Sequence, residues 1–241
     1  ALASDAPVAV NVGRKRGGSW KDRALIVWSL PDWEAGAEID LPEALQPFRI
    51  ALSPDGKTVY VRTGRTENPE EKSVDPGEKP DDHFEQSLWR ERNDGYVSDL
   101  LQIDVGSGEV KKRVRCFDAS NNFRIYPTDS GVVCADYSQY VGVWDVEKDT
   151  YEARWTDGFA YGSGTGPKGN IYTGSLASFL VISPAGKVLA KGSVSKLPGF
   201  PEYFSDFAPL GEDKVVAVTD ASRLIVIDAN EHKVLQEKPV Y

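Results

Sequence analysis

The chain has 241 residues, of which 40% are hydrophobic and 10% aromatic, so it is long enough to bury a large core. No stretch reaches the roughly 20 apolar residues that a membrane-spanning helix needs. The formal net charge of −9 argues against nucleic acid as a partner, because an acidic surface repels phosphate backbones. The same charge suits the attraction of cationic partners or small amines.

The N-terminus and the two cysteines bear on the compartment. The segment "ALASDAP" carries small residues spaced as Ala1-Leu2-Ala3, like the trailing end of a secretory cleavage region. The alternative is an N-terminus that was trimmed artificially. Cys116 and Cys134 are the two cysteines. They would form a natural disulfide in an exported protein and would more often be free thiols in the cytosol.

Short alternating segments separated by turn residues predict strands in chain order. The stretch "FRIALSPDGKTVYVRTG" predicts a strand ending at Leu52, a turn over 53–56 and a second strand over 57–63. Proline presets φ at the second turn position, and Asp-Gly tolerates the positive φ that follows. Further on, "LLQIDVGSGEVKKRVRC" predicts two strands joined by a turn at 106–108.

This four-strand unit recurs along the chain. Strands are predicted near 123–127, 131–137, 140–146 and 150–156, and later turns at 167–169, 184–186, 211–213 and 230–231. Each unit spans about 40 residues, the period of a propeller blade, and four units open with Phe48, Phe123, Phe159 and Phe204. A single four-stranded sheet cannot bury both faces, so neighbouring sheets must stack face to face. The sequence therefore predicts an all-β fold, a β-propeller of four-stranded antiparallel blades.

The blade count has two interpretations. We expect a single propeller domain over 1–241, with blades at approximately 1–43, 44–117, 118–157, 158–196 and 197–241. The first blade shows three strands and is one short of its innermost strand. Either the chain closes with five blades, the first incomplete, or it forms part of a longer, seven-bladed ring.

A long acidic insertion, residues 66–95, interrupts the second blade between two strands. Loops of this length are usually functional or disordered. The alternatives are a solvated acidic loop and a docking arm or Ca²⁺ site, although calcium loops need regularly spaced ligands that this loop lacks. Phe84 and Trp89 near its end are predicted to bind a partner. So is Trp20 in the basic stretch "GRKRGGSWKDR", which is alternatively a solvated connecting loop.

The sequence offers little catalytic chemistry. The two histidines, His83 and His232, lack a recognisable nucleophile partner, and His232 is expected on the surface at a strand turn. No zinc-ligand spacing, dinucleotide motif or P-loop occurs. The Gly-rich "YGSGTGPKG" is expected to be a loop joining blades. We therefore predict no catalytic residue, no metal site and no cofactor on this chain.

Several stretches resemble a known family. "LSPDGKTVYV" followed by "LLQIDVGSGEV" is similar to the repeat of the YVTN and quinoprotein amine dehydrogenase-like propellers. "ALIVWSLPDWEAGAEIDLPEA", "NFRIYPTDSGVVCADYSQ" and "RLIVIDANEHKVLQE" resemble the heavy, β-propeller subunit of methylamine and aromatic amine dehydrogenases. The resemblance runs loosely over residues 10–240.

The resemblance implies a non-catalytic subunit that is periplasmic or secreted and binds no cofactor itself. Such subunits hold a small light subunit with a tryptophan-derived quinone, which oxidises primary amines and passes electrons to a small copper protein or cytochrome. We also expect a disulfide between Cys116 and Cys134, because the crossing from one blade to the next can bring these strand ends together; buried free thiols are the alternative. Two departures stand against the resemblance: seven blades need more residues than this chain has, and the family's first cysteine would fall near Asn122.

Two other functions stay open. The first is a stand-alone secreted or periplasmic propeller that binds a protein or ligand without enzyme activity. The second is a hydrolytic propeller such as a lactonase, which needs several carboxylates around a central metal. Asp136, Asp206 and Asp220 are imaginable as such carboxylates, although no pattern singles them out.

Overall fold

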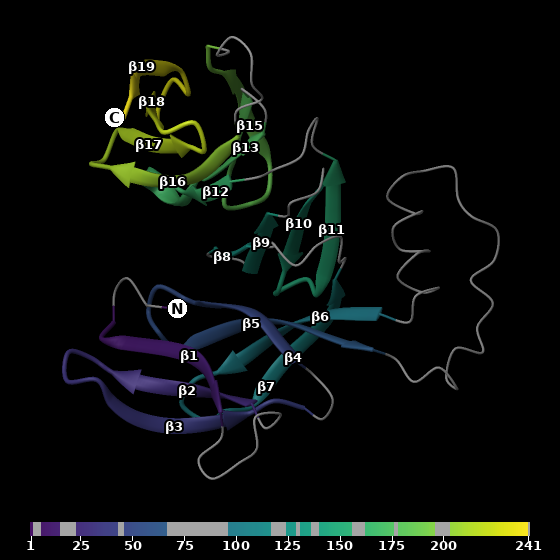
Figure 1. Ribbon diagram of the computed structural model, residues 1–241. Helices are drawn as coiled ribbons and strands as arrows, with labels where there is room; N and C mark the ends of the chain where they lie inside the picture. The colour runs from purple at the N-terminus through teal and green to yellow at the C-terminus, as the bar shows by residue number, and fades with distance from the viewer. Residues whose placement is uncertain are drawn as a thin grey trace, which may run out of the picture. The chain divides into compact units, whose positions relative to one another are not determined.

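The computed structural model describes residues 1, 6–14, 23–42, 46–66, 96–116, 124–128, 131–135, 140–155, 162–175, 178–195 and 203–240 (Figure 1). The chain divides into two compact units, Ala1–Asn121 with Lys148–Tyr151 and Asn122–Glu147 with Glu152–Tyr241, and each is described by itself. The predicted blade boundaries and the single-domain organisation stay predictions. Among the described residues, no helix has the length and apolar character needed to cross a membrane.

The first unit contains two sheets of consecutive strands (Figure 1). The first sheet has three strands in the order β1 (Val8–Arg14), β2 (Arg23–Ser29) and β3 (Glu34–Asp40). The second has four, in the order β4 (Gln46–Leu52), β5 (Thr58–Thr66), β6 (Tyr96–Asp104) and β7 (Val110–Cys116). The three-stranded first sheet confirms the predicted strand count over the part of the chain described. At its β1 edge, Ala1 N donates to Val10 O at 2.6 Å, and Val10 N donates to Ala1 O at 2.9 Å.

The remaining three sheets have four strands each. The third consists of β8 (Arg124–Pro127), β9 (Gly131–Ala135), β10 (Tyr140–Asp145) and β11 (Thr150–Trp155). The fourth consists of β12 (Gly162–Thr165), β13 (Ile171–Ser175), β14 (Ser178–Ile182) and β15 (Val188–Ser193). The fifth consists of β16 (Phe204–Leu210), β17 (Lys214–Thr219), β18 (Arg223–Asp228) and β19 (Val234–Pro239). The predicted all-β fold is thereby confirmed.

Local turn chemistry explains where the strands end. The predicted turn between β4 and β5 is closed by a hydrogen bond from Gly56 N to Ser53 O at 3.0 Å. Gly56 has a φ of 71°, a left-handed conformation that glycine adopts without steric cost. The Asp55 carboxylate also accepts hydrogen bonds from Ser53 Oγ at 2.7 Å and from Lys57 N at 3.1 Å. Such turns are fixed by residues close in sequence, so they could be predicted.

Neighbouring sheets within each unit bury their apolar faces against each other. In the first unit, one cluster draws on both sheets: Val10, Leu25, Ile39, Leu52, Val59, Val61, Leu101 and Ile103. In the second unit, the third and fourth sheets share Tyr126, Val133, Val141, Ile171 and Ile182. The fourth and fifth share a larger aromatic cluster that includes Tyr172, Phe179, Phe204 and Phe207. This face-to-face packing is the arrangement of propeller blades.

The Gly-rich stretch departs from its prediction. Residues 162–165 form β12 rather than a loop, and only Pro167–Gly169 forms the expected turn, as a short 3₁₀ helix, η2. The physical reason is close packing of strands: a Cβ on Gly164 would lie 1.9 Å from the carbonyl oxygen of Phe207 on β16. Glycine is therefore needed here because two backbones approach each other.

Candidate functional site

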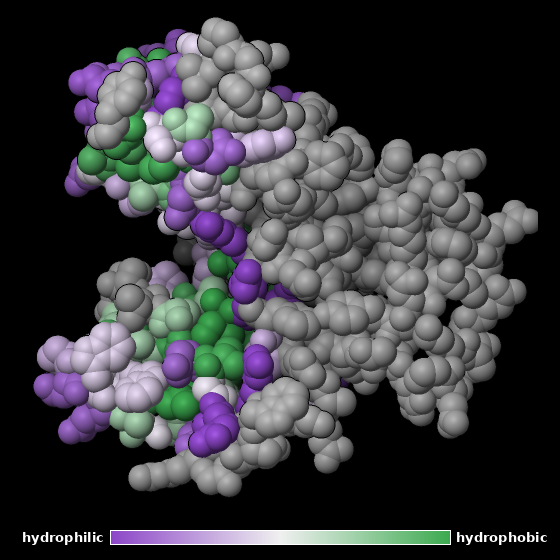
Figure 2. Space-filling view, viewed as in Figure 1, coloured by the Kyte–Doolittle hydropathy of each residue, from purple (hydrophilic) through white to green (hydrophobic). Residues whose placement is uncertain are grey.

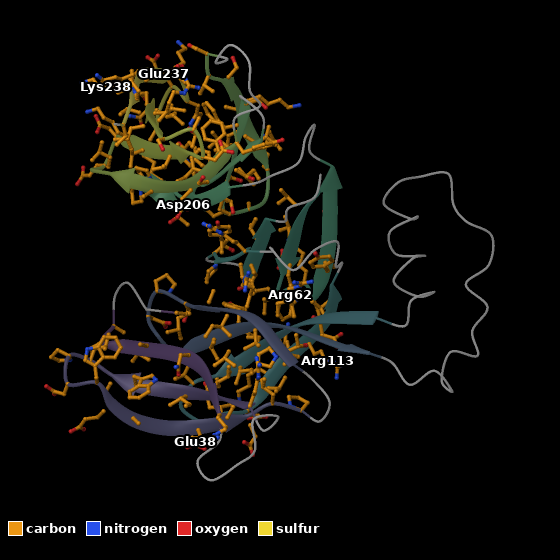
Figure 3. The ribbon with its side chains drawn as sticks, viewed as in Figure 1. Glu38, Arg62, Arg113, Asp206, Glu237 and Lys238 are labelled. Carbon is orange, nitrogen blue, oxygen red and sulfur yellow. The ribbon has the colours of Figure 1, made fainter. Side chains whose placement is uncertain are left out.

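A polar cluster joins the first strands of the three sheets in the second unit. Arg124 and Tyr126 lie on β8, Ser163 on β12 and Asp206 on β16, where Figure 3 labels it. The Tyr126 hydroxyl donates to Ser163 Oγ at 2.7 Å. The Arg124 guanidinium donates to the Asp206 carboxylate at 2.7 Å and also to the Ser163 carbonyl. Three strands that are distant in sequence are thus linked by four side chains.

The electrostatics of this cluster suit a structural link between the three strands more than a catalytic site. Burial raises the pKa of Tyr126, so its hydroxyl stays protonated and can donate to Ser163. Burial alone would lower the pKa of Arg124, but the hydrogen bond and the attraction from Asp206 outweigh it and raise that pKa. The Arg124 and Asp206 side chains are 42% and 60% exposed, so their ion pair contributes little to stability. The cluster satisfies its own charges and hydrogen bonds.

The carboxylates considered for a hydrolytic metal centre have other partners. Asp206 accepts from Arg124 and from Phe207 N at 2.9 Å. Asp220 is exposed in a turn and accepts a hydrogen bond from Tyr203 N at 2.9 Å. Asp136 lies outside the described residues. Within the described ranges, no group of three or more histidine, cysteine or acidic side chains is placed to hold a metal ion.

The predicted partner-binding and disulfide side chains lie outside what the structure describes. Phe84, Trp89 and Trp20 lie outside the described residues. Cys116 ends β7 and Cys134 lies in β9, but their side chains are outside what the structure describes. Both the partner contacts and the disulfide therefore stay predictions.

His232 differs from its prediction as a plain surface residue. It is half-buried, and its Nδ1 lies 3.3 Å from the hydroxyl of Tyr172. His232 adopts a left-handed φ of 56° in the turn between β18 and β19, and its ring meets the edge of the Tyr172 ring. Burial, with a smaller contribution from the charge of Asp228, raises the pKa of Tyr172 to about 12.

The fifth sheet presents apolar side chains on the face that points away from its core. In the strand register, Val216 lies between Ala208 and Val226, and Val218 lies opposite Leu224. These positions alternate with the buried Val215, Ala217, Ile225 and Ile227. We define the outer apolar face as Ala208, Leu210, Val216, Val218, Leu224 and Val226.

Among the described residues, the outer apolar face is exposed and has a polar border. Leu210, Val218 and Leu224 are 48%, 39% and 39% exposed. Hydrophobic residues are visible on the surface over β16–β19 in Figure 2. The strand register places polar residues around this face: Lys214, Asp228, Gln236 and Lys238. An apolar centre with a polar rim is the usual composition of a protein-binding surface.

The sequence carries a local signal for this face. The segments "KVVAVT" and "RLIVID" are nearly continuous apolar runs and do not alternate with polar residues. Such runs are typical of strands that are covered on both faces. They therefore indicate that the second face of this sheet is also suited to contact.

The comparisons with known proteins agree with the fold. No family model matches the chain, and no curated protein matches it. In structure the chain is similar to a chain in "Crystal Structure of Mitotic Checkpoint Complex", with a TM-score of 0.61 and 10% sequence identity. The match covers 98% of this chain and 61% of that one. At this identity the likeness shows the fold alone, which is a β-propeller.

Proposed function

We propose that this chain is a non-catalytic propeller that binds another protein through the outer apolar face of its fifth sheet. The observation that carries the proposal is the exposure of Leu210, Val218 and Leu224 on one side of a sheet whose other side is buried. Burying such side chains is worth roughly 25 cal/mol for each Å² of apolar surface. Large exposed apolar patches with polar rims mark sites of protein interaction.

The chemistry of the face also indicates the kind of partner. Elsewhere in the chain, sheet faces of this composition are covered by the apolar side chains of another sheet. A partner that offers an apolar surface with polar groups at its edge would match both the centre and the rim. The border residues Lys214 and Lys238 would then meet acidic groups on that partner, which sets orientation more than affinity.

The test uses two leucines of similar exposure. Leu224→Gln places an amide in the centre of the outer apolar face. The control, Leu189→Gln, makes the same substitution outside that face, on β15, where Leu189 is 45% exposed. In chemical crosslinking from the native source, we expect wild type and L189Q to capture the same partner and L224Q to lose it. Unchanged capture by L224Q would refute the proposal. So would a concentration-dependent dimer that L224Q abolishes, because the face would then bind a second copy.

A finer proposal concerns the partner's identity. The sequence resemblance supports a small light subunit with a tryptophan-derived quinone, in a periplasmic or secreted amine dehydrogenase-type oxidoreductase that passes its electrons to a small acceptor protein. This chain would contribute no cofactor, and Phe84, Trp89 and Trp20 would add contacts. A copurifying small subunit with quinone absorbance and amine-dependent dye reduction is the expected result. Dye reduction by the purified chain alone would contradict this division of labour.

A further inference from the structure

Two arginines lie directly opposite each other at the end of the β1–β2 hairpin. The antiparallel register pairs Arg14 with Arg23, two positions after it pairs Val12 with Leu25. Directly opposite residues place their Cβ atoms about 4.5–5.5 Å apart, and like charges in that position destabilise a sheet. Positions that break a local rule of this kind are expected at functional or strained sites.

The described residues do not neutralise this pair. Arg14 and Arg23 are both exposed, and neither side chain takes part in an ion pair or hydrogen bond within the described part of the chain. The nearest acidic strand positions, Glu38 and Asp40 on β3, lie opposite Ile26 and Ala24 in the register. Because side chains alternate along a strand, these two carboxylates belong to the other face of the sheet.

The two arginines border a cavity. Together with Val12 and Gly13 they line an open cavity of about 360 Å³. A water molecule takes up about 30 Å³ of liquid volume, so a carboxylate-bearing side chain fits there with room to spare. The arginine guanidinium is a planar fork of donors that matches the two oxygens of a carboxylate.

We infer that Arg14 and Arg23 form a binding site for the carboxylate groups of an acidic segment of a partner protein. The inference rests on the proposed function, because it gives that partner a second, charged contact. The stretch 14–23 carries five basic residues and one acidic residue in a chain of net charge −9. The two adjacent arginine charges attract a short acidic segment, while the charge of the whole chain still repels a long nucleic acid.

A peptide titration tests the site directly. The probe is fluorescein-labelled hexaglutamate, with hexaglutamine as the neutral control, measured by fluorescence anisotropy at low and high salt. Arg14→Gln with Arg23→Gln should weaken hexaglutamate binding about tenfold, the size expected for two partly exposed charge contacts. The matched control, Lys168→Gln with Lys187→Gln, removes the same charge at exposed positions elsewhere and should leave binding unchanged.

Two further measurements keep the test decisive. Removing two opposed like charges should leave the melting temperature of R14Q/R23Q equal to or above that of wild type, so lost binding cannot be ascribed to unfolding. Arg14→Lys with Arg23→Lys keeps the charge without the planar fork and should bind with intermediate affinity.

Three results would overturn the inference. The first is that the lysine control weakens hexaglutamate binding as much as R14Q/R23Q does. The second is that R14Q/R23Q binds hexaglutamate as tightly as wild type. The third is that the protein binds a hexaphosphoserine peptide but not hexaglutamate. Leu224→Gln should not affect hexaglutamate binding. Failure to capture a partner, with hexaglutamate binding retained, would therefore contradict the proposed function alone. Capture of a partner without hexaglutamate binding would contradict this site alone.

Discussion

At the scale of single residues, the turn between β18 and β19 shows how local bonds place a side chain. The Asp228 carboxylate accepts hydrogen bonds from Asn230 N and Glu231 N, both at 2.8 Å, and these bonds lower its pKa. The turn continues to His232, whose ring lies against Tyr172. The turn itself could be predicted from its sequence. The contact with Tyr172 could not, because the two residues are 60 positions apart.

Tyr172 should make the protein sensitive to alkali. Its pKa is raised to about 12 from an ordinary value of 10.0, so folding favours the protonated phenol. That contribution is fully present below pH 10 and is lost as the pH rises toward 12. We expect Tyr172→Phe to flatten the loss of stability across this range, measured by urea unfolding at each pH. Tyr151→Phe, on a half-buried tyrosine of β11, is the control, and equal slopes for wild type and Y172F would contradict the assignment.

At the scale of elements, the sequence predicted strands and turns well but not how strands touch across sheets. The predicted strand ranges near 140–146 and 150–156 agree with β10 and β11 to within one residue, because alternation and turn residues are local signals. The contact of Arg124 with Asp206 spans 82 positions and carries no local signal. The glycines of β12 were misjudged for the same reason, since their role depends on β16.

Gly164 should tolerate no side chain. A Cβ there would overlap the backbone of Phe207, so one strand would have to move, and overpacking of this kind costs about 1–3 kcal/mol. We expect Gly164→Ala to lower the free energy of unfolding by about 2 kcal/mol. Gly36→Ala, on strand β3, meets nothing closer than the Val27 carbonyl oxygen at 3.4 Å and should have a small effect. Equal effects of the two substitutions in urea unfolding would show that β12 and β16 are less tightly packed.

A buried ion pair joins the last two strands. Arg223 on β18 donates to Glu237 on β19 at 2.8 Å, and its guanidinium also donates to the Ser195 carbonyl at 2.8 Å, while Glu237 accepts from Ser195 N at 3.0 Å. Glu237 is labelled on β19 in Figure 3. The two side chains are 6% and 20% exposed, so removing one partner leaves a poorly solvated charge.

Glu237→Ala should therefore destabilise the protein by about 3 kcal/mol in urea unfolding. Replacing both partners, Arg223→Met with Glu237→Met, should recover most of that loss, because no unpaired charge remains. The exposed pair Lys233–Glu231, with side chains 73% and 66% exposed, supplies the control. Glu231→Ala should change the free energy of unfolding by less than about 0.5 kcal/mol. An E237A effect as small as that of E231A would mean that water reaches the pair.

At the scale of the whole molecule, the repeat of strands predicted the propeller because each sheet is encoded by one continuous stretch, of about 40 residues except in the second, which carries the insertion. What the repeat does not encode is which surface the propeller uses. The outer apolar face depends on side chains of β16, β17 and β18 lying in register, and the Arg14–Arg23 pair depends on a hairpin register. The apolar runs of β17 and β18 indicate that both faces of the fifth sheet are apolar, but only the strand pairing shows which side chains share the outer face. The Arg14–Arg23 pair has no such local signal.

The covalent state of the whole chain is the remaining prediction. Cys116 closes the second sheet and Cys134 lies in the third, so a bond between them would close a loop of 18 positions. A loop of this size would constrain the unfolded chain and add about 3 kcal/mol to stability in the chain-entropy account. Peptide mapping by mass spectrometry without reductant should show the two cysteine peptides linked in protein purified from its native compartment. Reduction, or Cys116→Ser, should then lower the melting temperature. If both cysteines of the native protein were instead alkylated as free thiols, the predicted disulfide would be wrong. The argument for export that rests on the cysteines would then fail as well.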